Sequence, residues 1–178
     1  KSGYEVQGSD VSSSKIIDRL ISLGVKIFIG HEKNNIKNAS IVVYSSAIKQ
    51  NNPEIVEAKK LFIPIIHRSE MLSELMKLKK SIAIAGTHGK TTTTSLISKI
   101  LDANKMDPTI INGGIISSLA SNAKLGQGQW MVVEADESDG SFSKLMPTVA
   151  VITNIDLEHL DFHKNEKNLE NAFINFIS

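Results

Sequence analysis

The chain has 178 residues, of which 41% are hydrophobic and 22% charged, and its formal net charge at pH 7 is +1. This composition is typical of globular proteins, which excludes disorder as the main state. Only Arg19 and Arg68 are arginines, which disfavours a surface that reads nucleic acid duplexes. The lack of cysteine excludes disulfides and thiolate catalysis. No apolar run reaches the roughly 18 residues of a membrane span, so we expect a cytoplasmic protein that binds neither nucleic acid nor membrane.

Short apolar runs rich in Val and Ile alternate with amphipathic stretches along the whole chain, the pattern of strands alternating with helices. The elements predicted for the first half are a strand at 4–8, a helix at 16–23 capped by Ser12, Ser13 or Ser14, strands at 25–29 and 41–44, a helix at 53–60, a strand at 63–66 and a helix at 71–78. Those predicted for the second half are a strand at 82–85, a helix at 90–103, strands at 109–111, 131–134 and 149–153, and a helix at 169–177.

Strands without polar alternation, interleaved with helices, indicate an α/β fold with a mostly parallel sheet covered on both faces. The polar segment 77–80 interrupts the apolar pattern and is the predicted boundary between two units. Both ends of the chain look cut. A glycine fingerprint would precede Lys1 if Asp10 is the acidic residue of a dinucleotide-type fold, and the last helix has no strand to follow it. We therefore expect a piece of a longer protein.

The segment Gly-Thr-His-Gly-Lys-Thr-Thr at 86–92 lies between a predicted strand and a predicted helix. In that context the backbone N–H groups of a glycine loop bind phosphate, the Lys reaches the terminal phosphates and a following hydroxyl holds Mg²⁺. The strict motif would place Gly where this chain has Ile84, so we predict a variant phosphate loop; an ordinary glycine-rich turn is the alternative. The predicted nucleotide-binding residues are Gly86, Thr87, His88, Gly89, Lys90, Thr91 and Thr92.

Four carboxylates fall within the six residues 134–139, directly after a predicted strand. In open parallel sheets, ligands bind outside the carboxyl ends of the strands. Glu134 is the best placed of the four to face the phosphate loop and hold Mg²⁺. A solvated acidic loop is the alternative interpretation.

The segment 153–161 follows the next predicted strand and offers an Asn, three carboxylates and His159. Imidazole is a common metal ligand, so His159 is either a ligand at this edge of the sheet or a solvated residue. The Asn112-Gly113-Gly114 segment either brings backbone close to a ligand or forms a turn. His31, His67 and His163 belong to no cluster in the sequence, and we predict them to be surface residues.

These motifs together resemble those of the Mur ligases of peptidoglycan synthesis. The matching blocks are collinear, extend over nearly the whole chain, and are 8–10, 45–48, 52–55, 68–72, 85–94, 112–114, 134–139, 153–155 with His159 and Asp161, and 173–176. One departure is Glu158, where relatives usually carry Asp before the histidine.

The resemblance implies a fold of three domains, and this chain resembles part of it. Residues 1–79 resemble a Rossmann-like parallel-sheet domain that binds a UDP-sugar, without its opening strand and glycine loop. Residues 80–178 resemble the N-terminal part of the central P-loop ATPase α/β domain, and the C-terminal ligase domain is absent.

The resemblance further implies an ATP- and Mg²⁺-dependent ligase whose substrates are UDP-N-acetylmuramate and L-alanine. ATP would phosphorylate the lactyl carboxylate to an acyl phosphate, which the amine of L-alanine attacks. It implies catalytic roles for Lys90, Glu134 and His159, and metal ligation by Thr91, Glu134 and His159. The substrate-binding residues that it implies are Asp10, Ser45, Ser46, Arg68, His88, Asn112, Asp136, Glu137 and Ser138.

Three alternatives stay open. A ligase that recycles murein tripeptide and a folylpolyglutamate synthase share the phosphate loop, but the first usually has Tyr where this chain has Ser138, and the second lacks the N-terminal domain. The third is a nucleotide-binding module without turnover. We expect the 178-residue chain by itself to fold, at least in its second half, but not to form the amide bond, because remote binding contacts position the reacting groups.

Overall fold

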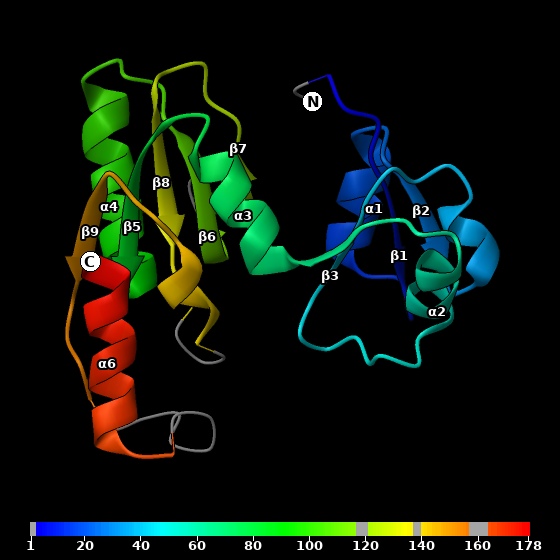
Figure 1. Cartoon of the computed structure of the whole chain (residues 1–178). Helices are drawn as coiled ribbons and strands as arrows, with labels where there is room; N and C mark the ends of the chain where they lie inside the picture. Colours follow the sequence, from blue (N-terminus) through cyan, green and yellow to red (C-terminus); the bar gives the residue numbers. More distant parts are fainter. Residues whose placement is uncertain (1–2, 117–120, 137–139, 157–163) are drawn as a thin grey trace. The chain divides into compact units, whose positions relative to one another are not determined.

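The structure is a computed structural model that describes residues 3–116, 121–136, 140–156 and 164–178. By its internal contacts the chain divides into two compact units, residues 1–68 and residues 69–178, which Figure 1 shows in blue to cyan and in green to red. The sequence predicts the boundary at 77–80 instead, between a UDP-sugar-binding domain at 1–79 and an ATP-binding domain at 80–178, and this division into domains stays a prediction.

Unit 1 contains parallel strand pairs and short helices. Its elements are β1 (Gln7–Asp10), α1 (Lys15–Ser22), β2 (Lys26–Ile29), the 3₁₀ helix η1 (Lys33–Ile36), β3 (Val42–Tyr44), α2 (Pro53–Lys60) and β4 (Ile65–His67). β1 pairs in parallel with β2, and β3 with β4. The caps are local: the Ser14 side chain accepts a hydrogen bond from the Ile17 N–H, and the Asn52 side chain caps α2 ahead of Pro53.

Unit 2 is built on a five-stranded sheet in the order β7-β6-β8-β5-β9. Its elements are α3 (Arg68–Met76), β5 (Lys80–Ala85), α4 (Lys90–Ala103), β6 (Thr109–Ile116), β7 (Ser121–Lys124), β8 (Trp130–Glu134), η2 (Ser141–Lys144), β9 (Val149–Ile152) and α6 (Glu166–Ile177). All pairs are parallel except that of β6 with β7. The predicted α/β class with a mostly parallel sheet is confirmed.

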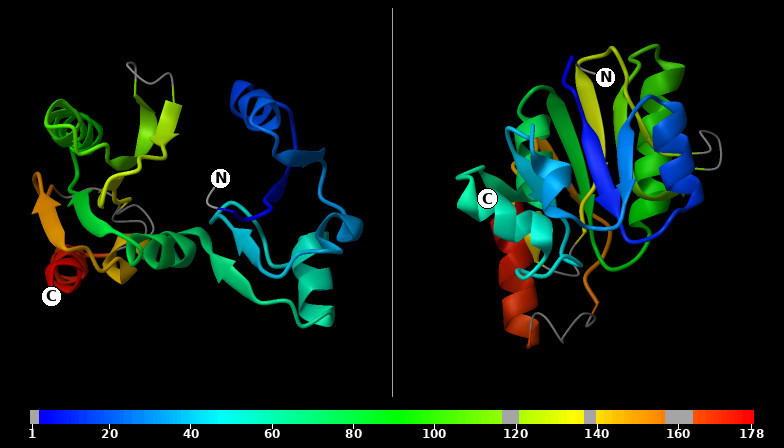
Figure 2. Two further views of the ribbon diagram at one scale, coloured as in Figure 1. Left: turned by 90° about the horizontal axis from the view of Figure 1, so that it is seen from above. Right: turned by 90° about the vertical axis from the view of Figure 1, so that its right-hand side faces the viewer.

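Helices cover both faces of this sheet. Seen from above, α4 lies on one face, and α3 and α6 lie on the other (Figure 2). On the face of α3 and α6, alternate residues of β5 and β8 join one apolar cluster with Met76 and the aromatic residues Phe142, Phe173 and Phe176. The ring centroid of Phe142 lies 5.0 Å from that of Phe173 and 5.4 Å from that of Phe176. This cluster forms the main core of unit 2.

Charged groups join β7 to the end of α4. Lys124 Nζ lies 2.8 Å from Asp102 Oδ1 and 2.9 Å from Asp107 Oδ1. The hydrogen bond from the Gln127 backbone N–H, followed by the contact with Lys124, lowers the pKa of Asp107 below its ordinary value of 3.8. The hydrogen bonds to Asp102 and then Asp107 raise the pKa of Lys124 above 10.5. We call this group the Lys124 cluster.

Several predicted elements need correction. β1 begins at Gln7 and runs through Asp10, because its partners on β2 are residues 26–29. The Asn112-Gly113-Gly114 segment is not a turn but lies inside β6, which extends to pair with β7. β7, η1 and η2 were not predicted, and α6 begins three residues earlier than expected, where the Asn165 side chain accepts from the Asn168 N–H. In the described ranges, no helix is both long and apolar enough to cross a membrane.

Candidate phosphate and metal site

The predicted phosphate loop joins the end of β5 to the start of α4, as the sequence motif requires. Gly86 has φ +129° and Gly89, the N-cap of α4, has φ +81°, values that side chains other than glycine rarely adopt. A Cβ on Gly86 would meet Thr153 Oγ1 and would lie 2.8 Å from the backbone oxygen of Asn154. Both glycines are therefore required by the path of the loop.

Residues that follow β9 hold the other side of this loop. The His88 N–H donates to Asn154 Oδ1 at 2.9 Å, and the Thr87 N–H donates to the Asn154 backbone oxygen at 3.1 Å. In return, Thr153 Oγ1 donates to the His88 backbone oxygen at 2.6 Å. The His88 ring lies 3.4 Å from an Asp156 carboxylate oxygen, with both side chains about 60% exposed. The sequence indicated that Asn154 stands at a strand end but did not predict that it fixes the loop.

Lys90 is the first residue of α4, and its ammonium group lies inside the loop. Its Nζ donates to the backbone oxygens of Gly86 at 2.6 Å and Thr87 at 3.1 Å. The helix N-terminus also carries the positive end of the helix dipole. The structure therefore concentrates positive potential at the carboxyl edge of the sheet, as anion binding requires.

Thr91 and Glu134 meet across the edge of the sheet. Thr91 Oγ1 lies 3.1 Å from both oxygens of the Glu134 carboxylate, and the Gly113 N–H donates to Glu134 Oε2 at 2.9 Å. A Cβ on Gly113 would lie 3.1 Å from Glu134 Oε1, so glycine lets this carboxylate approach β6. The predicted pairing of Thr91 with Glu134 is thus present in the geometry.

Strand β6 also contains a buried amide, the side chain of Asn112, directly before Gly113. Asn112 is 3% exposed, and neither its Nδ2 nor its Oδ1 has a hydrogen-bond partner among the described residues. Thr94 Oγ1, one turn after Lys90 on α4, is likewise buried without a partner in the described part of the chain. A buried polar group costs about 1–3 kcal/mol when it stays unpaired. Such atoms are expected where a water or a ligand group completes the structure.

The residues present fit a magnesium ion. The hydroxyl of Thr91 and the carboxylate of Glu134 are hard oxygen donors that contact each other directly, and Mg²⁺ prefers such donors. Within the described ranges, no three His, Cys, Asp or Glu side chains gather into a metal-binding group. The predicted ligand His159 and the predicted substrate residues Glu137 and Ser138 lie outside the described residues. Asp136, which is described, is exposed.

In unit 1 the predicted substrate residues follow the carboxyl ends of three parallel strands. Asp10 ends β1, Ser45 and Ser46 follow β3, and Arg68 follows β4. Asp10 and Arg68 are exposed. The carboxyl ends of parallel strands are the usual place for ligands in open α/β sheets.

Two histidines predicted to be surface residues instead make specific contacts. The His31 side chain is only 16% exposed, and its Nδ1 lies 3.3 Å from Glu54 Oε2. His67 Nε2 lies 3.0 Å from the hydroxyl of Ser46, and its ring packs edge-on against Tyr44. His31 is more covered than predicted because its partner Glu54 is distant in sequence, whereas His67 stays partly exposed, as predicted. His163 lies outside the described residues.

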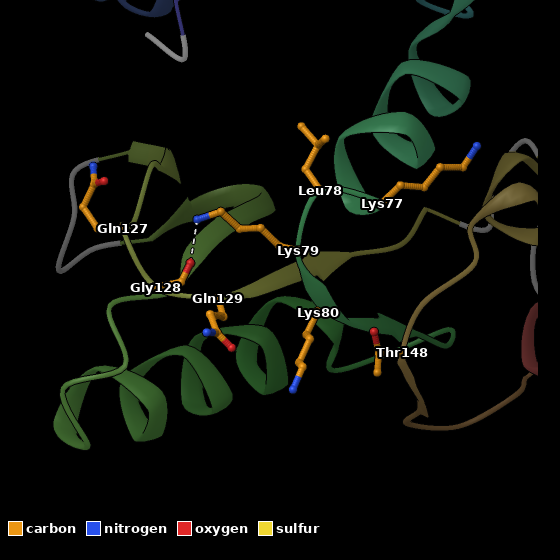
Figure 3. Close-up of a pocket in the computed structure, with 8 residues that line it drawn as sticks. All are labelled: Lys77, Leu78, Lys79, Lys80, Gln127, Gly128, Gln129 and Thr148. Atoms are coloured by element: carbon orange, nitrogen blue, oxygen red, sulfur yellow. Dashed lines mark hydrogen bonds between the residues drawn. The ribbon is translucent and has the colours of Figure 1, made fainter.

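A cavity of about 550 Å³ lies in a different part of unit 2 (Figure 3). It is lined by the segment 77–80 before β5, the segment 127–129 before β8, and Thr148 before β9. These are the amino ends of parallel strands, whereas the phosphate loop follows a carboxyl end. Lys79 Nζ donates to the backbone oxygens of Gly126 and Gly128 at 2.7 Å each, so its ammonium group is paired within the protein. None of the predicted site residues lines this cavity.

Comparison with family models assigns both parts of the chain. The model described as Mur ligase family, catalytic domain, matches residues 1–80. The model described as Mur ligase middle domain matches residues 84–178.

Curated relatives match over almost the whole chain. UDP-N-acetylmuramate–L-alanine ligase from Brucella anthropi is 55% identical over 175 residues, which are 98% of this chain and 37% of the relative. The ligase of the same name from Geotalea uraniireducens is 56% identical over 99% of this chain and 38% of the relative. The chain thus spans little more than a third of the length of these relatives.

Solved structures give the same result for the fold. The UDP-N-acetylmuramate-alanine ligase MurC from Thermotoga maritima matches with a TM-score of 0.90 at 33% identity, covering 98% of this chain and 41% of that one. The UDP-N-acetylmuramate:L-alanyl-gamma-D-glutamyl-meso-diaminopimelate ligase from Neisseria meningitides matches with a TM-score of 0.84 at 25% identity, covering 99% and 60%. Together with the middle-domain model, which matches more than half of the chain, these likenesses show that the protein belongs to the Mur ligase family.

Proposed function

We propose that this chain is the UDP-sugar-binding and ATP-phosphate-binding part of a ligase that joins L-alanine to UDP-N-acetylmuramate. The observation that carries the proposal is that the Lys90 ammonium group lies inside the loop after β5, while the next residue, Thr91, contacts Glu134 at the end of β8. The relatives that are 55–56% identical carry that activity in their names, which supports the choice of substrates.

In this proposal, Lys90 bridges the terminal phosphates of ATP. The N-terminus of α4 faces the phosphates, and the contacts of Asn154 with the Thr87 and His88 N–H groups keep the loop in shape before ATP arrives. Phosphoryl transfer depends on positioning and charge neutralisation more than on covalent help from the protein. The loop and Lys90 supply both to the transferring phosphoryl group.

Thr91 and Glu134 would hold Mg²⁺, with His159 as a ligand of a second ion. When bound, the metal supplies charge neutralisation on the phosphates and on the attacking carboxylate. The chain's own residues would orient the metal ligand and the substrate. The Gly113 N–H orients Glu134, and the amide of Asn112, which has no hydrogen-bond partner among the described residues, would bind the substrate. His88, Asp136, Glu137 and Ser138 are further residues that we propose to bind the sugar and its lactyl group.

Residues 1–79 would bind the UDP-sugar through Asp10, Ser45, Ser46 and Arg68, which follow carboxyl ends of strands. The lactyl carboxylate would then be phosphorylated to an acyl phosphate that the amine of L-alanine attacks. Because the relatives extend well beyond the matched region, we propose that the 178 residues alone do not complete this reaction.

The experiment is amino-acid-dependent phosphate release by the longer protein that contains this chain. We expect release with UDP-N-acetylmuramate, L-alanine and Mg-ATP. Preference for a murein tripeptide over L-alanine would favour the recycling ligase, whose solved relative also matches this chain. The same assay on the 178-residue chain separates a ligase from a binding module: comparable release would show that the catalytic parts lie within these residues.

Replacing Glu134 tests the metal site directly. Glu134→Gln removes the negative charge but keeps the shape, and we expect turnover to fall by about 100-fold or more. Glu74→Gln is the control, because Glu74 is 62% exposed and pairs with Lys77 on α3. Unchanged turnover in Glu134→Gln, at saturating Mg²⁺, would contradict the assignment.

A further inference from the structure

A buried carboxylate in unit 1 joins segments that the sequence keeps apart. Glu54, in the first turn of α2, is 9% exposed. Its Oε2 accepts a hydrogen bond from the Ser9 hydroxyl at 2.7 Å, and its Oε1 accepts one from Asn35 Nδ2 at 2.7 Å. His31 Nδ1 lies 3.3 Å from Oε2 and 3.1 Å from the Ser9 hydroxyl. We call Glu54, Ser9, His31 and Asn35 the Glu54 network.

Burial of this carboxylate requires the whole network. A buried charge is tolerated only where hydrogen bonds replace its lost hydration. Here two side-chain donors and an imidazole surround the two oxygens. The position in the first turn of α2 adds the favourable end of the helix dipole. Removing the charge therefore changes how these segments are held.

The network fixes the ends of β1 and β2. Ser9 directly precedes Asp10, whose backbone oxygen accepts from the Gly30 N–H at 2.7 Å. Asn35 Nδ2, which donates to Glu54, also donates to the Gly30 backbone oxygen at 3.2 Å. Gly30 has φ +96°, which makes a sharp bend. Its backbone N–H and its backbone oxygen are both hydrogen-bonded, and these two bonds hold the bend. His31 directly follows Gly30 and contacts Ser9, the residue before the proposed substrate residue Asp10.

Counting protons assigns the tautomer of His31. The Ser9 hydroxyl has one hydrogen, which it donates to Glu54 Oε2. Its oxygen therefore accepts in its contact with His31 Nδ1, and Nδ1 must carry a hydrogen. In the neutral ring, Nε2 is then the acceptor nitrogen. In many sites, the hydrogen bond made by one ring nitrogen of a histidine determines which of the two nitrogens carries the proton.

We propose that Glu54 is a positioning residue of the UDP-sugar site. Through Ser9 and Asn35 it fixes the bend at Gly30, which is hydrogen-bonded to Asp10 and directly precedes His31, and it holds the His31 proton on Nδ1. This inference rests on the proposed function in placing the UDP-sugar at this edge of unit 1. Glu54 itself does not touch the substrate in this arrangement; it acts through the segments that it joins.

The binding test uses the longer ligase with Glu54→Gln and, as a matched control on the same helix, Glu57→Gln, whose carboxylate pairs with Lys60. We expect Glu54→Gln to raise the KM for UDP-N-acetylmuramate by about tenfold or more, while the KM for ATP changes by less than about twofold, because ATP binds in unit 2. Glu57→Gln should leave both unchanged. An equal rise in the KM for UDP-N-acetylmuramate and in the KM for ATP would show general destabilisation of the protein instead and would overturn the positioning role.

The tautomer test needs no substrate. In the longer ligase with ¹⁵N-labelled histidine, ring nitrogen shifts should show the His31 proton on Nδ1, and Glu54→Gln should redistribute it. If Glu54→Gln does not fold, Ser9→Ala makes the same test, since it removes the hydroxyl between His31 and Glu54. A wild-type His31 with its proton on Nε2, or a preference unchanged in a folded variant, would overturn the inference. If the wild-type ligase does not bind a UDP-sugar, the proposed function fails and the site role with it, whereas the tautomer result still decides whether Glu54 orients His31.

Discussion

Gly86→Ala tests whether the phosphate loop packs as the structure shows. At φ +129° an alanine is strained whatever space surrounds it, and such backbone strain costs about 1–3 kcal/mol. The added Cβ would also meet Thr153 Oγ1 and lie 2.8 Å from the Asn154 backbone oxygen. Overpacking of this kind costs about another 1–3 kcal/mol.

Gly89→Ala separates the two causes. Gly89 also has a positive φ, +81°, but a Cβ there would have no atom within 4 Å. Its replacement should therefore cost only the strain of the left-handed conformation, about 1–2 kcal/mol. The difference between the two variants measures the packing of the loop against the segment after β9.

Urea unfolding followed by Trp130 fluorescence is the assay, because Trp130 is the only tryptophan and lies in β8 of unit 2. We expect the free energy of unfolding to fall by about 2–6 kcal/mol in Gly86→Ala, and by clearly less in Gly89→Ala. If Gly86→Ala is no less stable than Gly89→Ala, the close approach of Asn154 to the loop is wrong.

Three further predictions concern charge and packing in unit 2. Lys90→Ala in the longer ligase should reduce turnover by orders of magnitude with a change in unfolding free energy of about 1 kcal/mol or less; wild-type kinetics would refute the phosphate role. Phe142→Ala, at a residue 1% exposed between two aromatic rings, should lower the free energy of unfolding by about 3–5 kcal/mol in urea titration. The Lys124 cluster should stabilise the fold fully between about pH 5 and pH 9. The pKa of Asp107 is lowered in the folded state, so the stabilisation by its carboxylate is lost as pH falls through that folded-state pKa. The pKa of Lys124 is raised, so the stabilisation by its ammonium group is lost as pH rises through that folded-state pKa. The stability difference between wild type and Lys124→Met should shrink at both extremes, and a difference that grows there would contradict this.

Local signals in the sequence were enough for the elements that form from their own residues. Helix α2 occupies 53–60 as predicted, because Asn52 and Pro53 mark its start within the segment itself. The strand, loop and helix that contain the predicted phosphate loop were found for the same reason: the strand, the two glycines, Lys90 and Thr91 are contiguous, and the geometry that they require is set by neighbouring residues. That Glu134 faces this loop also followed, since the loop and Glu134 both come after carboxyl ends of strands in a parallel sheet.

Features that depend on distant partners were decided only by the tertiary structure. The polar segment 121–124 has no strand pattern of its own and becomes β7 because β6 offers an antiparallel edge. Likewise, Asn154 fixes a loop 66 residues away, as the contact with His88 shows. His31 looked like a surface residue because Glu54, its partner in the fold, lies 23 positions further along the chain.

The physical reason is the range over which each signal acts. Caps, glycine turns and apolar periodicity act over a few residues, so the sequence determined the α/β class, most helices and the phosphate loop by itself. The cost of burying Glu54 or Asn112, and the choice of partner that offsets it, depend on which segments fold against each other. Only the tertiary structure therefore decided the Glu54 network, the contacts that hold the loop from β9, and the burial of the Asn112 amide in β6, which has no partner in the described part of the chain.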